Sequence, residues 1–301
     1  MSADYLEIRA GRLEKFATVH AITTVAGLFR KLKSFDEAKW AFRGQGKDWP
    51  LTATIDRYAI RPGIAEDYAM REFRRRVHHY VADVPQRDDD LEWLALMQHY
   101  GAPTRLLDWT RSSEVAAFFA ASSTPFIRRP AEPGAPFVIW VLDAASINEE
   151  ASTMLGLPKS EDLSSSETFH KIYWRQPQEE LYLAFAVQPY RMNERLTIQQ
   201  GLFVCANHPL LPFHNCLFGL LLHAQKHDRR SGEWLHKIVV ADETRADVLR
   251  SLNKVNINAA TLFPGLDGFC RSLQVSVQLQ ELGDWPGVSK TLDRENWVKG
   301  T

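Results

Sequence analysis

Four short apolar segments in the second half of the chain place the strongest constraint on its fold. They are rich in β-branched and aromatic residues, lie between turn-forming residues, and cover 137–142, 181–187, 201–206 and 234–241. Segments of this length and composition predict strands. An earlier strand is predicted at Trp40-Ala41-Phe42-Arg43-Gly44, where the following glycines indicate a turn and place Arg43 at the strand end.

Helical patterns dominate the first half and return at the end. Apolar residues recur at intervals of three and four, or form uncharged runs, which predicts helices over 24–33, 65–81, 91–100, 113–119 and 244–253, and a final one starting near 262. The residues 105–109 between the third and fourth helix are expected as a strand or a tight loop. Since strands and helices do not alternate regularly, the sequence predicts an α+β fold, with a mixed, largely antiparallel sheet core flanked by helices.

The 301 residues allow one large domain or two modest ones. Residues 1–40 are expected to be poor in strands, with 1–20 as an N-terminal lead-in before the main domain, and 276–301 are expected as a C-terminal extension. The segment 148–167 is rich in serine and acidic residues, which predicts a mobile surface loop or an insertion.

Charge and cysteine content exclude several classes of protein. Thirty-six basic and 37 acidic residues give a net charge of −1, so no overall attraction to nucleic acid is expected. A local basic cluster around 71–79 is predicted to be a solvated helix face rather than a binding stripe. Three scattered cysteines indicate neither a disulfide framework nor a cysteine-rich zinc site. With no signal-peptide pattern and no long apolar segment, we expect a cytoplasmic protein that does not enter a membrane.

Three polar segments are candidates for a functional site. In Phe42-Arg43-Gly44-Gln45-Gly46, an arginine beside glycines can approach an anion closely, although the tripeptide taken alone favours a surface arginine in an ordinary turn. The stretch from Met97 to Thr110 holds Arg105, Asp108 and Trp109 between apolar helices. Polar groups in such a place either pair with each other or take part in function. The third segment, 195–203, contains Gln199, whose amide offers both donors and an acceptor.

Other kinds of site find little support. The residues His78, His79, His99 and Asp108 do not have the spacing of a zinc signature, so we expect no metal. The chain has neither a phosphate-binding glycine loop followed by Lys-Ser nor a Gly-x-Ser-x-Gly elbow, which argues against nucleotide hydrolysis and acyl transfer.

Taken in order, the three segments resemble the FRG domain, which is named for the tripeptide present here as Phe42-Arg43-Gly44. The run from His99 to Thr110 resembles the most specific stretch of that family, and Gln199-Gln200-Gly201-Leu202-Phe203 resembles its later motif. The segment 262–268 is similar to its C-terminal motif. The resemblance therefore implies an FRG domain over residues 21–275.

The order of motifs is also similar to that of ADP-ribosyltransferases, and this resemblance implies NAD as a substrate. Arg43, with Gly44, Arg105 and Trp109, would then bind the ligand, while Thr110 would support the ribose and Gln199 would contact its hydroxyls. The sequence departs from that pattern because it lacks a Ser-Thr-Ser element and has Gln199 in place of a glutamate. Asp108 is our candidate for the missing negative charge.

The resemblance leads to three alternatives. The first is an ADP-ribosyltransferase-like protein that binds NAD or a related nucleotide and cleaves or transfers at its glycosidic bond, as a toxin or in phage defence, with a protein or nucleic-acid acceptor and an antidote or regulatory protein as partners. The second is a non-catalytic FRG module that binds a nucleotide, RNA or protein. The third is an interaction scaffold without a small ligand.

Overall fold

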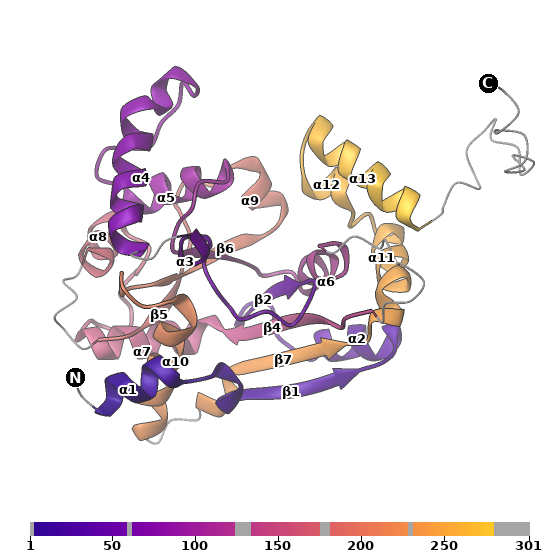
Figure 1. The fold of residues 1–301 in the computed structure, drawn as a ribbon, viewed down its shortest axis with the longest axis horizontal. Coiled ribbons are helices and arrows are strands. Elements are labelled where there is room, and N and C mark those ends of the chain that lie inside the picture. The colour runs from indigo at the N-terminus through magenta and orange to yellow at the C-terminus, as the bar shows by residue number, and fades with distance from the viewer. Residues whose placement is uncertain (1–2, 59–61, 124–133, 175–180, 228–230, 280–301) are drawn as a thin grey trace, which may run out of the picture.

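A seven-stranded sheet forms the centre of the molecule (Figure 1). The computed structural model describes residues 3–58, 62–123, 134–174, 181–227 and 231–279. The strand order is β1-β7-β4-β2-β3-β6-β5. The strands are β1 (Ala17–Ile22), β2 (Trp40–Gln45), β3 (Leu106–Thr110), β4 (Phe137–Asp143), β5 (Ala184–Val187), β6 (Gly201–Ala206) and β7 (Leu235–Val240). Only β1 and β7 pair in parallel among these described strands, and the other pairings are antiparallel.

Helices cover both faces of this sheet, which confirms the predicted α+β fold with a mixed, largely antiparallel sheet. The α-helices are α1 (Ala3–Ala10), α2 (Val25–Leu32), α3 (Thr54–Tyr58), α4 (Pro62–Arg76), α5 (Asp90–His99), α6 (Ser113–Ser122), α7 (Ala144–Leu155), α8 (Ser166–Tyr173), α9 (Glu194–Ile198), α10 (Phe213–Lys226), α11 (Arg245–Lys254), α12 (Ala259–Leu262) and α13 (Leu266–Gln278). Short 3-10 turns lie at Leu13–Lys15, Val77–His79, Ser231–Glu233 and Asp242–Thr244.

Strand β4 shows how the sequence divides the core. All seven of its residues are buried, and successive side chains of a strand point to opposite faces of the sheet. Val138, Trp140 and Leu142 belong to the core on the side of α5, α7, α8 and α10. The alternate residues, such as Ile139 and Val141, belong to the core on the side of α2, α6 and α11. A strand that is apolar on both faces therefore lies in the middle layer of the protein.

The stretch from Met97 to Thr110 lies between two helices, α5 and α6, whose ends are marked by capping residues. Helix α5 is capped at its N-terminus by Asp89, whose carboxylate accepts a hydrogen bond from the Glu92 amide. After this helix, Gly101 adopts a φ of 83°, a left-handed conformation that glycine takes without strain. Helix α6 is capped at its N-terminus by Ser112, whose hydroxyl accepts from the Val115 amide. Strand β3 is thus held between two capped helices.

The structure corrects two expectations about organisation and adds one helix. The lead-in is not strand-poor, because β1 forms an edge of the sheet. The segment 148–167 is not one loop: α7 continues to Leu155, α8 begins at Ser166, and only the residues between them connect the two helices. Helix α10 was not predicted at all. Of the expected C-terminal extension, α13 includes the first residues, and 280–301 lie outside the described residues.

Within the described part of the chain, no helix is both long and apolar enough to cross a membrane.

Candidate functional site

The sheet has a seam between β2 and β3. These strands share one residue pair, Phe42 with Thr110, whereas β2 pairs with β4 over six residues and β3 with β6 over five. On one side of that pair the strands separate, which leaves the backbone carbonyl of Asp108 without a strand partner on β2. Nη1 of Arg43 donates a hydrogen bond to this oxygen at 2.5 Å. A side chain therefore bridges the seam where the backbone ladder does not.

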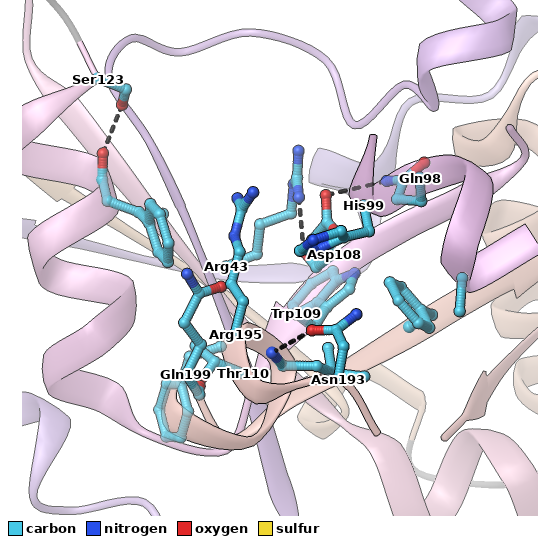
Figure 2. A pocket seen from close by; sticks show the side chains of 16 residues that line it. Arg43, Gln98, His99, Asp108, Trp109, Thr110, Ser123, Asn193, Arg195 and Gln199 are labelled. Carbon is cyan, nitrogen blue, oxygen red and sulfur yellow. Dashed lines mark hydrogen bonds between the residues drawn. The ribbon is translucent and has the colours of Figure 1, made fainter. Parts of the chain in front are cut away.

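A pocket of about 260 Å³ opens at the seam (Figure 2). Its walls come from β2, α5, β3, α6, α9 and β6, and the chain thus brings together residues that are far apart in sequence. The lining residues are Phe42, Arg43, Gly44, Ala95, Gln98, His99, Asp108, Trp109, Thr110, Phe119, Ser123, Asn193, Arg195, Leu196, Gln199 and Phe203. Six of the seven expected site residues are among them; the exception is Arg105.

The Arg43 guanidinium is confined by its surroundings. Burial lowers the pKa of Arg43, while the nearby Asp108 carboxylate acts in the opposite direction. Its Nε is buried and has no hydrogen-bond partner among the described residues. Next to it, Gly44 lies against the backbone of α6, where an added Cβ would overlap the Ala116 carbonyl oxygen. Glycine is required here for the close approach of strand and helix, in addition to any role in ligand binding.

Asp108 is the exposed residue of β3. Its Oδ2 accepts a hydrogen bond of 3.0 Å from Nε2 of Gln98, on α5. The same Gln98 amide also donates to the Leu106 carbonyl at 3.3 Å, and its Oε1 accepts from the Thr104 hydroxyl at 2.5 Å. Both the nitrogen and the oxygen of the Gln98 amide are therefore hydrogen-bonded, and the nitrogen holds the Asp108 carboxylate at the rim of the pocket.

Thr110 and Gln199 are joined to each other through the backbone. The Thr110 hydroxyl donates to the Gln199 carbonyl at 2.6 Å and accepts from the Ser112 amide at 3.0 Å. Nε2 of Gln199 donates to the Leu262 carbonyl at 2.9 Å. Both side chains therefore tie elements together: Thr110 links β3 to the segment before β6, and Gln199 links that segment to α12.

Trp109 forms part of the apolar side of the pocket. It is only 3% exposed, and its Nε1 is buried without a hydrogen-bond partner in the described residues. Phe42 and Phe203 are also fully or almost fully buried in this wall. The pocket thus combines an aromatic floor with a polar rim.

One family model matches this part of the chain: the FRG domain, over residues 38–125. The chain carries an FRG domain. The match runs from β2 to the end of α6 and includes Arg43, Asp108 and Thr110, so the FRG domain supplies one side of the pocket. No curated protein and no solved structure matches the chain. The predicted domain limits of 21–275 stay a prediction.

Arg105 belongs to the FRG domain but does not reach the pocket. Its side chain is buried, forms an ion pair with Glu66 of α4, and lies 3.9 Å from the ring centroid of Tyr173. Nη1 also donates to the Asn207 carbonyl at 3.1 Å. Arg105 is therefore buried and hydrogen-bonded, its partner is Glu66 rather than Asp108, and the geometry assigns it to packing instead of ligand binding.

Outside the matched FRG residues, Arg195 lies in the third polar segment, but no role for it was predicted from the sequence. This residue of α9 lines the pocket, and its guanidinium carbon lies 4.6 Å from the ring centroid of Phe263. Burial lowers the pKa of Arg195, and Asp108 acts against this shift. No hydrogen bond joins the Arg195 side chain to another described residue. Its position four residues before Gln199, one helical turn away, is the signal that would have indicated it.

His99 is a second missed residue of the pocket. Burial and the charge of Arg195 both lower the pKa of His99 below its ordinary value. The imidazole is therefore neutral at pH 7 and can both donate and accept a hydrogen bond. Among the described residues, no group of three or more His, Cys, Asp or Glu is placed to hold a metal ion.

Proposed function

We propose that the pocket binds NAD or a related nucleotide. One observation carries this proposal: two guanidinium groups, Arg43 and Arg195, line a single small pocket whose charged groups include only one carboxylate, Asp108. With His99 neutral, the lining is positive, and guanidinium groups are well suited to phosphate. Figure 2 shows Arg43, Arg195 and Asp108 around the same hollow.

The hydrogen-bonding capacity of the pocket supports an acceptor-rich ligand. Nε of Arg43 and Nε1 of Trp109 are buried donors without partners among the described residues, and neither group can accept a hydrogen bond. Phosphate, ribose and amide oxygens are acceptors that fit such donors after a small adjustment of the walls. The partly buried ring of Phe119, which also lines the pocket, offers an aromatic surface for a base or a nicotinamide ring.

The size of the pocket limits how a dinucleotide binds. A volume of about 260 Å³ is slightly below the ~300–1,000 Å³ typical of pockets for drug-sized ligands. One half of NAD therefore lies inside, and the other half extends along the open side. A mononucleotide or ADP-ribose fits the same chemistry.

The finer part of the proposal is catalysis at the glycosidic bond. The bond between the anomeric carbon and the nicotinamide nitrogen breaks, and its electron pair leaves with nicotinamide. The exposed Asp108 carboxylate offsets the positive charge that develops on the ribose, and Oε1 of Gln199 faces the hydroxyls. An acceptor then bonds to the anomeric carbon and loses a proton. In this form the protein is an ADP-ribosyltransferase-like toxin or defence effector, controlled by an antidote or regulatory protein.

A second candidate function is that of a non-catalytic binding module. It is favoured by the hydrogen bonds of Thr110 and Gln199, because the hydroxyl proton of Thr110 and the amide of Gln199 already bind backbone carbonyls. In this case the same pocket holds a nucleotide, an RNA end or a protein segment without turnover.

Incubation of the purified protein with NAD separates these functions. Release of nicotinamide, followed by chromatography, with loss of release in Asp108→Asn, supports the enzyme. A rise in melting temperature without release supports the binding module. If NAD, ADP-ribose and AMP all leave the melting temperature unchanged and no nicotinamide appears, the nucleotide proposal is wrong and the scaffold alternative remains.

A further inference from the structure

Helix α13 exposes a row of large apolar side chains that nothing in the proposed pocket uses. Leu266, Phe269, Leu273 and Val277 are 76%, 52%, 38% and 60% exposed. Their spacing of three, four and four residues places them along one side of the helix. We call these four residues the α13 stripe. Figure 1 shows α13 at the edge of the molecule, beside α12 and above α11.

The stripe is separate from the face by which α13 packs on the protein. Gly268 lies against the Phe263 carbonyl, and Ser272 and Val275 line a groove that α13 forms with α11 and α12. At 3.6 residues per turn, the stripe occupies a sector of about 80° next to this packing face. Phe269 lies at the border between the two and also lines the groove.

The charged residues of α13 point away from the stripe. Asp267 and Arg271 form an ion pair at 2.9 Å, so they neutralise each other. On the helical wheel both lie more than roughly 100° from the centre of the stripe. An apolar surface without net charge does not repel an identical surface, whereas exposed apolar rows of this kind generally mark an interface.

The order of the residues fits a two-fold axis. If two α13 helices are aligned antiparallel about a point between residues 271 and 272, Leu266 faces Val277 of the second copy, and Phe269 lies near Leu273 of the second copy. Each large residue then meets another large residue, as in an isologous interface, where one patch is its own partner. We propose that a second copy of this chain covers the α13 stripe, in an antiparallel helix pair.

Sedimentation velocity of the full chain tests the proposal. Between about 1 and 100 µM, a concentration-dependent dimer is expected, because a helix pair of this size forms a small interface. Leu266→Asp and Val277→Asp each place a charge in the stripe and are expected to weaken the dimer roughly tenfold or more. Val255→Asp is the matched control, since Val255 directly follows α11, is 63% exposed and lies outside the stripe. Equal melting temperatures show that all variants fold.

Cross-linking tests the orientation. Cys270 is exposed, whereas Cys205 and Cys216 are buried, so Cys270→Ser leaves no accessible thiol among the described residues. In that background, Leu266→Cys mixed with Val277→Cys is expected to yield a dimer with a short bismaleimide, and each protein alone is expected to yield little.

Three results overturn the proposal. The first is a protein that stays monomeric at every concentration. The second is a dimer whose affinity is unchanged in Leu266→Asp and Val277→Asp. The third is cross-linking only between identical positions, which indicates a parallel pair.

Discussion

Arg43 is the residue on which the proposed function depends most directly. Its Nη1 is held by the Asp108 carbonyl, so the plane of the guanidinium that lines the pocket is fixed. Arg43→Lys keeps the positive charge but loses the planar, forked set of N–H donors, and we expect NAD to bind roughly 1.5 to 3 kcal/mol more weakly. Arg43→Ala is expected to weaken binding further. Calorimetric titration beside a melting curve measures both; a destabilised variant with unchanged affinity would remove Arg43 from the site.

Arg195 provides a second test at the residue scale. Its guanidinium is positioned by Phe263 and is not engaged by a carboxylate within hydrogen-bonding distance among the described residues. Arg195→Ala is expected to weaken ADP-ribose by roughly 1.5 to 3 kcal/mol and adenosine, which lacks phosphate, by much less. Arg191→Ala is the control, because Arg191 precedes the same helix but pairs with Asp83. Equal losses for both ligands would show that Arg195 acts only on the fold.

At the scale of elements, the buried ion pair between Glu66 and Arg105 joins α4 to β3. Glu66→Gln leaves the Arg105 charge buried without its counter-ion, and we expect a loss of about 3 to 5 kcal/mol in the free energy of unfolding. Asp67→Asn, on the same helix, removes the exposed partner of Arg71 and is expected to cost less than about 1 kcal/mol. Urea denaturation compares the two. Similar losses would contradict the packing role of Arg105.

A contact between two histidines on β1 and β7 predicts that the stability of the fold depends on pH. Nε2 of His20 lies 3.3 Å from Nδ1 of His236 on β7, and burial, with the charges of His20 and Lys31, lowers the pKa of His236 from 6.5 to about 4. Above pH 6.5 the residue is neutral in both the folded and unfolded states. As the pH falls toward 4, the unfolded state takes up the proton first, so stability is lost.

His236 is partly buried, and this loss amounts to roughly 1 to 2 kcal/mol after allowance for solvent screening. Melting temperatures between pH 7 and 4.5 measure it. His236→Gln is expected to flatten the profile, and His78→Gln, at an exposed site, to leave it unchanged. A profile of the same slope in His236→Gln would show that other groups cause the acid sensitivity.

At the scale of the whole molecule, a ligand bound at the seam is expected to contact both parts of the sheet, which meet between β2 and β3 through a single residue pair. Arg43 lies on β2, whereas Asp108 and Gln199 lie on or beside β3 and β6. A ligand at about 100 times its dissociation constant adds roughly 2.7 kcal/mol to stability. We expect hydrogen exchange to slow in β2 and α9 together, with β1 and β7 less affected. Protection of only one side would show that the ligand does not bridge the seam.

The sequence predicted elements whose burial follows a simple pattern. The limits of β6 were found without error, and β4 and β7 within one residue at each end, because apolar strands between turns are distinctive. Helix α10 was missed because it is buried on nearly all sides, and its uniform apolar run has no helical period. Strand β1 was missed because an edge strand with exposed residues lacks that apolar signal.

The candidate site was less predictable because it depends on contacts between distant segments. Arg43, Asp108 and Gln199 were grouped through the resemblance to the FRG domain, and the pocket contains all three. The partner of Arg105 depends on how α4 packs against β3, which no local pattern encodes. Arg195 was overlooked for the same reason: Phe263, which positions it, lies in the connection between α12 and α13.

The carbonyl that holds Arg43 determines what a substitution at position 108 can change. This oxygen belongs to the backbone of residue 108, and every amino acid at that position would supply it. Substitution of Asp108 therefore removes a negative charge from the pocket without removing the anchor of the arginine. The charge of the pocket and the orientation of Arg43 are therefore set by different atoms of the same residue, and a change of side chain at position 108 is expected to alter the first while leaving the second in place.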